Sequence, residues 1–295
     1  MHPNPFGLSA ALTTPFDAVG RCATDVAIAH ARRCLRDGCS SVTLFGTTGE
    51  GSSISAPERT AILDAFEAGG IRGDQLVACV MANAAGDAVA QSAEILARGA
   101  RGVLLAPPSY FKNVSEAGVL AWFREVIGGL GAEARGIILY NIPSVTAVEL
   151  PVSLISALRA EFGPAIVGVK DSSGNWSYTE RLLAGHRDIA ILIGDERSLA
   201  AGVRLGAQGA ISGMANVLPQ RLSALIRDGR DNPTISELVE VVLKYPVTPA
   251  VKALVAHRSG DEGWTRVRAP LVSTPAEGRA RLGPMIDRFF AAAAA

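Results

Sequence analysis

The sequence predicts an α/β protein, a TIM (β/α)8 barrel with a C-terminal helical appendage. Between residue 8 and about residue 228, eight short apolar runs alternate with longer segments of helical character. Most of the runs are almost continuously apolar, which is typical of parallel strands covered on both faces. No Gly-x-Gly-x-x-Gly motif follows the first run, so a doubly wound dinucleotide-binding sheet is disfavoured. Eight strands alternating with helices favour the barrel.

The expected strands are three to six residues long, and Val, Ile, Leu and Ala dominate them. They cover Leu8–Thr13, Ser41–Phe45, Leu76–Met81, Gly102–Leu105, Gly136–Tyr140, Ala165–Val169, Ile189–Ile193 and Gly209–Ile211.

The segments between the strands open with residues that favour a helix start. Pro57 stands in a first turn with Glu58, and Ser115 offers a capping hydroxyl. Glycine-containing runs at 99–102 and 206–209 are typical of helix ends that precede a strand. Helices are therefore expected over Asp25–Arg36, Pro57–Ala68, Asp87–Arg98, Ser115–Ile127 and Pro151–Ala160.

The chain after the barrel is also expected to be helical, with loops rich in Pro and Gly. We expect a catalytic barrel domain over residues 1–230 and a helical appendage over residues 231–295. Residues 291–295 are expected to fray and to have no function. The appendage helices are expected over Pro233–Lys244, Pro249–His257 and Pro275–Ala292.

Composition narrows the classes of partner. The 28 basic and 28 acidic side chains balance to zero net charge, which gives no reason to expect nucleic acid or an anionic membrane as a partner. No apolar stretch approaches the roughly 18 residues of a membrane-spanning helix, and residues 1–6 lack the pattern of a secretory signal. The four cysteines form no Cys-x-x-Cys pair, so we expect reduced thiols in a cytoplasmic protein. With only four histidines, a histidine-rich metal site is not expected.

The distribution of lysine points to one position. Only four of the 28 basic residues are lysines, and Lys170 stands at the end of residues 165–170, which are predicted to be a buried strand. TIM barrels carry their active sites at the C-terminal ends of the strands. Desolvation lowers the pKa of a buried amine, and the neutral amine can form a Schiff base with a ketone. Pairing with Asp171 would instead make Lys170 a structural residue, and both interpretations stay open.

Two further strand ends carry polar groups. Gly46-Thr47-Thr48-Gly49 supplies hydroxyls and accessible backbone amides, which suit a small carboxylate or phosphate. The same residues are also compatible with an ordinary turn between a strand and a helix. Tyr140 could shuttle protons or simply cap the barrel core, and Glu50 could be a helix-start acid. Together, the amine, the turn and the phenol describe a carbonyl-activating site.

Three motifs resemble the dihydrodipicolinate synthase/N-acetylneuraminate lyase family. They are Phe45-Gly46-Thr47-Thr48-Gly49-Glu50, Tyr140-Asn141-Ile142-Pro143 and Gly168-Val169-Lys170-Asp171-Ser172-Ser173-Gly174. The resemblance runs over essentially the whole chain. It implies a cytoplasmic lyase, usually a homotetramer, that condenses or cleaves pyruvate adducts as a class I aldolase without a metal or other cofactor. Its ligand would be a small 2-oxo acid.

The resemblance also implies roles for single residues. Lys170 would form the imine, Tyr140 would be the acid and base, and Thr47 would relay protons to it. The hydroxyl and amide of Thr48 would hold the substrate carboxylate. The remaining substrate contacts would come from Gly46 and Gly49 in the same turn and from the backbone near Ile211.

The distal end of the substrate is where the chain departs from lysine-biosynthetic members. They carry an arginine that grips the second substrate's carboxylate, where this chain has Val145. The departure favours a 2-keto-3-deoxy sugar acid or a related hydroxy-2-oxo acid. Ser172, Asp195 and Glu196 could bind its hydroxyls, although Asp195 and Glu196 could also merely begin a helix.

A second departure concerns the relay tyrosine that a neighbouring subunit donates in this family. Aligning Ser115 with the family's serine places Phe111 at that position and Tyr110 one residue earlier. Either Tyr110 serves, or water completes a shorter relay. Two alternative functions remain: a dihydrodipicolinate synthase with altered carboxylate recognition, and a catalytically degenerate barrel that binds a 2-oxo acid. Aldol cleavage and dehydration proceed through the same enamine, so the residues do not separate them.

Overall fold

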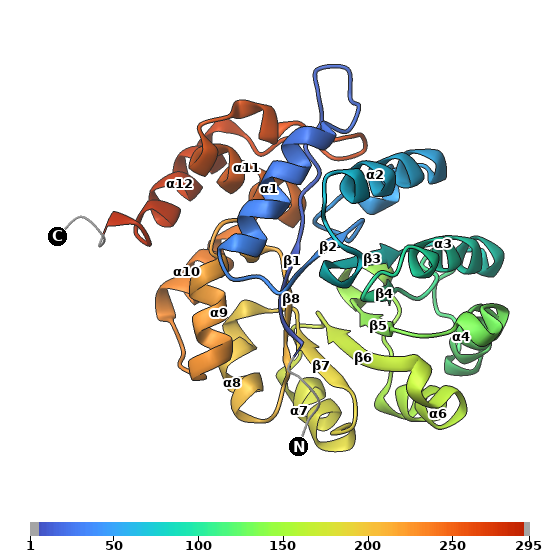
Figure 1. The fold of residues 1–295 in the computed structure, drawn as a ribbon. Helices are drawn as coiled ribbons and strands as arrows, with labels where there is room; N and C mark the ends of the chain where they lie inside the picture. The colour runs from blue at the N-terminus through green and yellow to red at the C-terminus, as the bar shows by residue number, and fades with distance from the viewer. Residues whose placement is uncertain (1–5, 292–295) are drawn as a thin grey trace.

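The computed structural model describes residues 6–291, which form a closed barrel of eight parallel strands (Figure 1). Each strand pairs with its neighbour in sequence, and the last pairs with the first. The predicted TIM barrel is confirmed. The strands are β1 Gly7–Ala11, β2 Ser41–Leu44, β3 Leu76–Val80, β4 Gly102–Leu105, β5 Ile137–Asn141, β6 Ile166–Asp171, β7 Ala190–Ile193 and β8 Gly209–Ser212.

Every expected strand overlaps an observed strand, and the ends differ by two residues at most. The difference that matters lies in β5 and β6, which run on to Asn141 and Asp171. Backbone pairing continues there because Tyr140 lies opposite Lys170 and Asn141 lies opposite Asp171. Lys170 therefore lies within β6, one residue before its end, and the strand fixes the direction of its side chain.

Helices cover the outside of the barrel, and most begin where the sequence indicates. Ser55 and Glu58 form a capping box at the first residue of α2, and the Ser115 hydroxyl accepts a hydrogen bond from the Gly118 amide at 3.2 Å. The outer helices are α1 Thr24–Arg36, α2 Ala56–Ala68, α3 Ala85–Ala97, α4 Glu116–Gly129, α6 Val152–Phe162, α7 Trp176–Gly185, α8 Leu199–Arg204 and α9 Pro219–Asp228.

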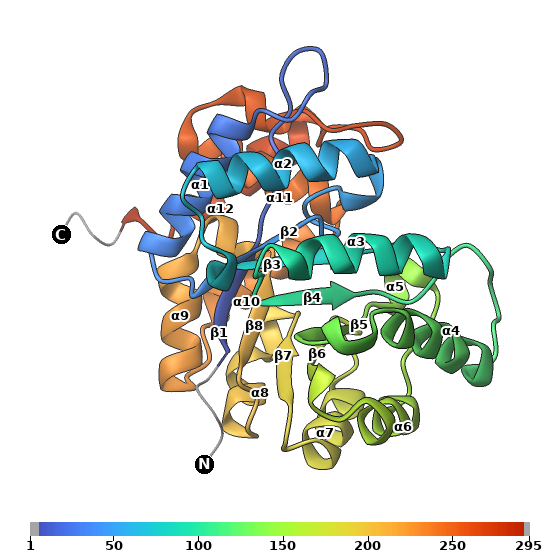
Figure 2. The same ribbon diagram turned by 45° about the vertical axis from the view of Figure 1, so that its right-hand side comes forward.

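Three more helices gather beside α1 and α9 and reach the C-terminal ends of the strands (Figures 1 and 2). They are α10 Pro233–Val242, α11 Val247–Ser259 and α12 Ala276–Asp287. The expected division at residues 230 and 231 falls in the turn between α9 and α10. Residues 248–256 of α11 are all buried, so this helix lies between the barrel and α12.

The last expected helix is too long. It ends at Asp287, because Phe289 turns back into the core and Phe290 stacks on the Arg258 guanidinium. The expectation for residues 292–295 lies outside the described residues.

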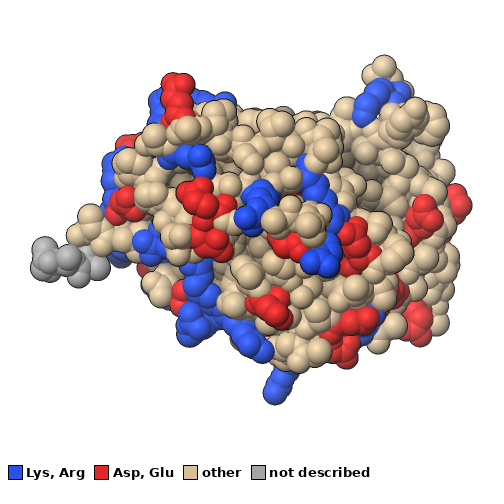
Figure 3. Space-filling model, turned by 90° about the horizontal axis from the view of Figure 1, so that it is seen from above, with Lys and Arg blue, Asp and Glu red and all other residues tan. Residues whose placement is uncertain are grey.

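Three further features concern the surface charges, the helices and the cysteines. On the face in Figure 3, basic and acidic side chains are intermingled. Within residues 6–291, none of the helices is long and apolar enough to cross a membrane. All four cysteines are free, and three of them are buried.

Candidate active site

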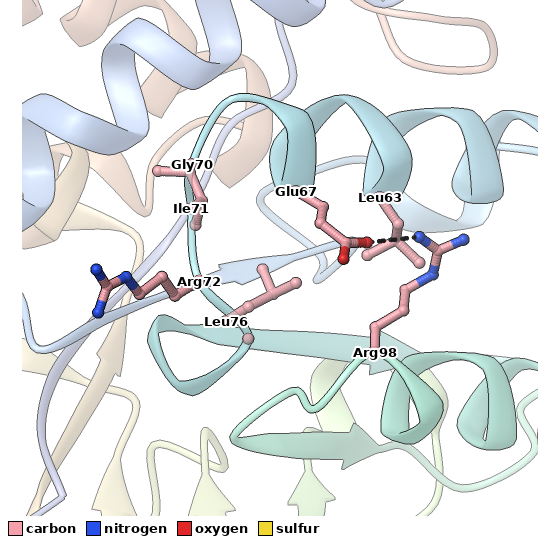
Figure 4. A pocket seen from close by; sticks show the side chains of 8 residues that line it. Leu63, Glu67, Gly70, Ile71, Arg72, Leu76 and Arg98 are labelled. Carbon is pink, nitrogen blue, oxygen red and sulfur yellow. Dashed lines mark hydrogen bonds and ion pairs between the residues drawn. The ribbon is translucent and has the colours of Figure 1, made fainter.

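A cavity of about 350 Å³ opens at the C-terminal ends of the strands. Loops after β2, β5, β6, β7 and β8 form part of its wall, and α10 and α11 form the rest. It brings together Thr47, Thr48, Tyr140, Lys170, Ser172, Asp195, Glu196 and Ile211 of the predicted site. A smaller hollow at the start of β3, drawn in Figure 4, holds none of these residues.

Lys170 and Tyr140 contact each other at the bottom of this cavity. The Lys170 Nζ donates a hydrogen bond to the Tyr140 Oη at 3.1 Å and lies 4.3 Å from the ring centroid. Both side chains are buried. The contact follows from the register of β5 and β6, which aligns the two residues. Such a pair places a nucleophilic amine beside an acid/base group.

The structure decides against Asp171 as the partner of Lys170. Asp171 accepts hydrogen bonds from Asn141 Nδ2 at 3.1 Å and from Thr179 Oγ1 at 2.6 Å. Neighbouring residues of a strand point to opposite faces, so Asp171 points away from the barrel interior. Among residues 6–291, no carboxylate lies within 4.0 Å of the Lys170 amine.

The turn after β2 presents hydroxyl groups to the cavity. Thr47 and Thr48 line the cavity, and the buried Thr47 Oγ1 has no hydrogen-bond partner among the described residues. Buried hydroxyls are normally paired, so an unpaired one in the cavity that Tyr140 also lines indicates a position that a ligand completes. Gly46 and Gly49 are not among the residues that line the cavity, so their expected substrate contact stays a prediction. Gly49 instead permits a close approach, since a Cβ there would lie 2.7 Å from the Leu12 carbonyl oxygen.

The turn is held from behind by a buried ion pair that the sequence analysis missed. Glu50 does not act as a helix-start acid, because its side chain caps no helix. Its Oε1 lies 2.6 Å from the Lys252 Nζ of α11, and its Oε2 accepts a hydrogen bond from the Arg268 amide at 2.9 Å. Both side chains of the pair are fully buried. Burial lowers the pKa of Lys252, and the Glu50 charge opposes this shift.

A second contact from α11 reaches the same turn. The Thr248 hydroxyl donates a hydrogen bond to the Thr47 carbonyl oxygen at 2.9 Å. The C-terminal helices thus fix the backbone that carries both threonines. A lysine within the apolar stretch Pro249-Ala250-Val251-Lys252-Ala253 was the available signal, and it is of the same kind as the signal at Lys170.

The loop after β7 supplies polar groups of two kinds. Asp195 caps the short helix η5 (Glu196–Ser198) and pairs with Arg197 at 2.7 Å, so for Asp195 the helix-start alternative describes the structure. The Glu196 Oε1 accepts hydrogen bonds from the Ser212 hydroxyl at 2.5 Å and from the Met214 amide at 3.3 Å. Burial raises the pKa of Glu196. Arg197 and Ser212 were not predicted, although Arg197 also lines the cavity.

Tyr110 and Phe111 lie away from the cavity. They are 73% and 71% exposed, contact each other edge to face, and do not line the site in the single chain. Val145 does line it, from the short helix α5 (Pro143–Thr146), and is 53% exposed.

Comparison with known proteins extends the description. A model of the dihydrodipicolinate synthetase family matches residues 4–288. The chain is 32% identical to an uncharacterized DapA-like lyase of Chloroflexus aurantiacus, over 97% of this chain and 98% of that protein. It is 31% identical to a 4-hydroxy-tetrahydrodipicolinate synthase of Methanosarcina mazei, over 84% of this chain and 82% of that protein. A crystal structure of dihydrodipicolinate synthase from Agrobacterium tumefaciens str. C58 superimposes with a TM-score of 0.95 and 58% identity, over 97% of this chain and 99% of that one.

Proposed function

Because this chain belongs to the dihydrodipicolinate synthetase family, we propose that it is a class I lyase that binds its 2-oxo acid on Lys170. The observation that carries the proposal is the buried Lys170 amine, which lies 3.1 Å from the Tyr140 hydroxyl and within 4.0 Å of no carboxylate in the described chain. The nearby Thr48 hydroxyl and backbone amide would hold the substrate carboxylate. Fixing the carboxylate would position the ketone against the amine.

The proposed reaction begins when the neutral Lys170 amine attacks the ketone carbon. The carbonyl oxygen leaves as water after protonation, and an iminium forms. In the cleavage direction, Tyr140 takes up the proton of the C4 hydroxyl as its own phenolic proton passes to Thr47 and on to solvent, and the C3–C4 bond breaks. Its electrons move into the iminium and give an enamine plus an aldehyde. Proton transfer to C3 and hydrolysis release pyruvate and restore Lys170, with Thr47 relaying protons.

The proposed substrate is a 2-keto-3-deoxy sugar acid or a related hydroxy-2-oxo acid. Val145 offers no bidentate contact to a second carboxylate, while Ser172 and the Glu196–Ser212 pair supply partners for hydroxyl groups. The second candidate is 4-hydroxy-tetrahydrodipicolinate synthesis. Arg197 favours it because this residue lines the cavity, but its bidentate pairing with Asp195 already engages its guanidinium.

We further propose a cytoplasmic homotetramer. The four free cysteines support a reducing compartment. The exposed Tyr110 and Phe111 support an interface, because two large side chains, 73% and 71% exposed at one loop tip, are typical of contact sites.

Borohydride trapping with pyruvate, followed by peptide mass spectrometry, tests the proposed function. We expect a reduced pyruvyl adduct on Lys170 in the wild-type protein. The matched control is Lys112→Ala, which removes an exposed lysine and should leave the adduct unchanged, while Lys170→Ala should abolish it. A folded wild-type protein without an adduct would refute both enzyme proposals. An adduct without turnover on any aldehyde would identify the degenerate 2-oxo-acid-binding barrel.

A further inference from the structure

The mouth of the active-site cavity is apolar on one side. Val145, Leu243 and Val247 all line the cavity and are 53%, 49% and 39% exposed. They come from α5, from the residue after α10 and from the first residue of α11. A group of large apolar side chains left exposed at one place marks a position that another apolar group covers.

This apolar wall continues inward to the catalytic turn. Val239 of α10 and Val251 of α11 also line the cavity and are buried. A Cβ placed on Gly213 would lie 3.2 Å from the Thr48 hydroxyl and 3.8 Å from a Val251 methyl, so the wall ends beside Thr48. It therefore extends from the solvent to the place where the substrate carboxylate is expected.

Most polar groups of the cavity come from other elements, with Ser144 of α5, next to Val145, as an exception. Ser172 and Ser173 follow β6, and Glu196 follows β7. None of the polar lining belongs to α10 or α11 within the described residues. A hydroxyl group lying on the loops after β6 and β7 finds hydrogen-bond partners, but one lying against the side chains of Leu243 and Val247 does not.

We propose that the substrate's distal end is apolar: a hydroxy-2-oxo acid that ends in a methyl or small alkyl group and not in a hydroxymethyl group. The inference rests on the proposed function and narrows its substrate class. A terminal hydroxyl against this wall would lose its water without gaining a partner, while a methyl group gains burial. Because the rim belongs to the cavity of Lys170, we assign its cover to the substrate and not to a second copy of the chain.

Two aldehydes that differ only at the distal carbon test the inference in the condensation with pyruvate. Lactaldehyde and glyceraldehyde of the same configuration share their aldehyde and adjacent hydroxyl groups, and differ in a methyl against a hydroxymethyl end. We expect kcat/KM to favour lactaldehyde by about tenfold or more, the size of a single apolar contact at a selective site. Leu243→Asn should erase this preference.

Leu205→Asn is the matched control. Leu205 follows the end of α8 as Leu243 follows the end of α10, and it is 53% exposed against 49%. It does not line the cavity, so its substitution should leave the aldehyde ratio unchanged. Val247→Thr, which keeps the shape of the side chain, provides a second rim variant if Leu243→Asn fails to fold.

Borohydride trapping with pyruvate on the same preparations distinguishes a failure of the proposed function from a failure of the inferred substrate preference. Without an adduct on Lys170 in the wild type, the proposed function itself fails. With an adduct, a preference for glyceraldehyde would overturn the inference alone, as would rim variants that keep the wild-type ratio. A rim variant that changes the molecular mass in light scattering but not the ratio would assign the rim to a subunit interface and also overturn it.

Discussion

At the scale of single residues, the identity of each neighbour decides what Lys170 can do. The Lys170 amine donates its hydrogen bond to the Tyr140 hydroxyl at 3.1 Å and not to a carboxylate, so a group that can exchange protons lies beside it. Arginine could not replace it, since a guanidinium remains protonated. Lysine is scarce in this chain, and the backbone places Lys170 at the bottom of the cavity, where an amine suits imine formation.

The first prediction concerns Tyr140→Phe. The phenyl ring keeps the packing of the barrel interior but removes the hydroxyl that we propose exchanges protons with the substrate. We expect the borohydride adduct on Lys170 to form as in the wild type, while kcat falls by about 10²–10⁴-fold. Trapping and steady-state rates on one preparation measure both quantities. Loss of the adduct together with the rate would show that Tyr140 is needed for imine formation itself.

At the scale of elements, the sequence predicted the barrel well because each strand and helix is specified by residues within its own segment. Apolar runs indicate the buried strands and helix-start residues indicate where helices begin. The ends of the observed strands differ from the expected ends by two residues at most. It also predicted the residues at the strand ends, since barrel topology alone brings Thr47, Tyr140 and Lys170 to one edge.

Partners that are distant in sequence could not be predicted in this way. Lys252 and Glu50 are 202 positions apart, and only the packing of α11 against the β2 turn brings them together. The choice between a capping and a ligand-binding role for Asp195 depends on where Arg197 points, which no local pattern specifies. The absence of Gly46 and Gly49 from the cavity wall likewise follows from the path of the turn.

The second prediction belongs to this scale and concerns Lys252→Met. The substitution leaves the Glu50 carboxylate buried without its cation, so we expect a loss of about 3–5 kcal/mol in the free energy of unfolding. Urea denaturation measures the loss. Adding Glu50→Gln should restore much of it, because the buried charge is then absent.

An exposed pair provides the control for Lys252. Arg288 and Glu237 lie 2.7 Å apart with side chains 51% and 53% exposed, so Arg288→Met should cost no more than about 1 kcal/mol. If both single variants lost similar amounts, the buried pair would not be what holds α11 against the turn.

At the scale of the whole molecule, the question is whether one chain holds a complete site. The single chain supplies an amine, a phenol and two threonines, while Tyr110 lies outside the cavity. The third prediction is that Tyr110→Phe lowers turnover in the assembled protein and Phe111→Leu does not. Steady-state rates measure the difference.

Mixed assemblies test whether Tyr110 acts across an interface. Lys170→Ala and Tyr110→Phe subunits, each of low activity alone, are expected to recover part of the activity when co-assembled, because one subunit's Lys170 can then meet its neighbour's Tyr110. No recovery in mixed assemblies of confirmed composition would show that the relay is contained within one chain or runs through water.

The helix α11 has a consequence for how this enzyme could be redesigned. Its first residue belongs to the apolar rim, while Thr248 and Lys252 on the same helix hold the turn that carries Thr47 and Thr48. One short stretch of chain therefore affects both substrate selectivity and reactivity: position 247 contributes to the rim, and positions 248 and 252 hold the turn. Libraries aimed at new aldehydes can randomise positions 243 and 247 freely, but they should keep positions 248 and 252 constant. A substitution at 248 or 252 would disturb the turn and inactivate the enzyme, so any change in its selectivity could not be measured.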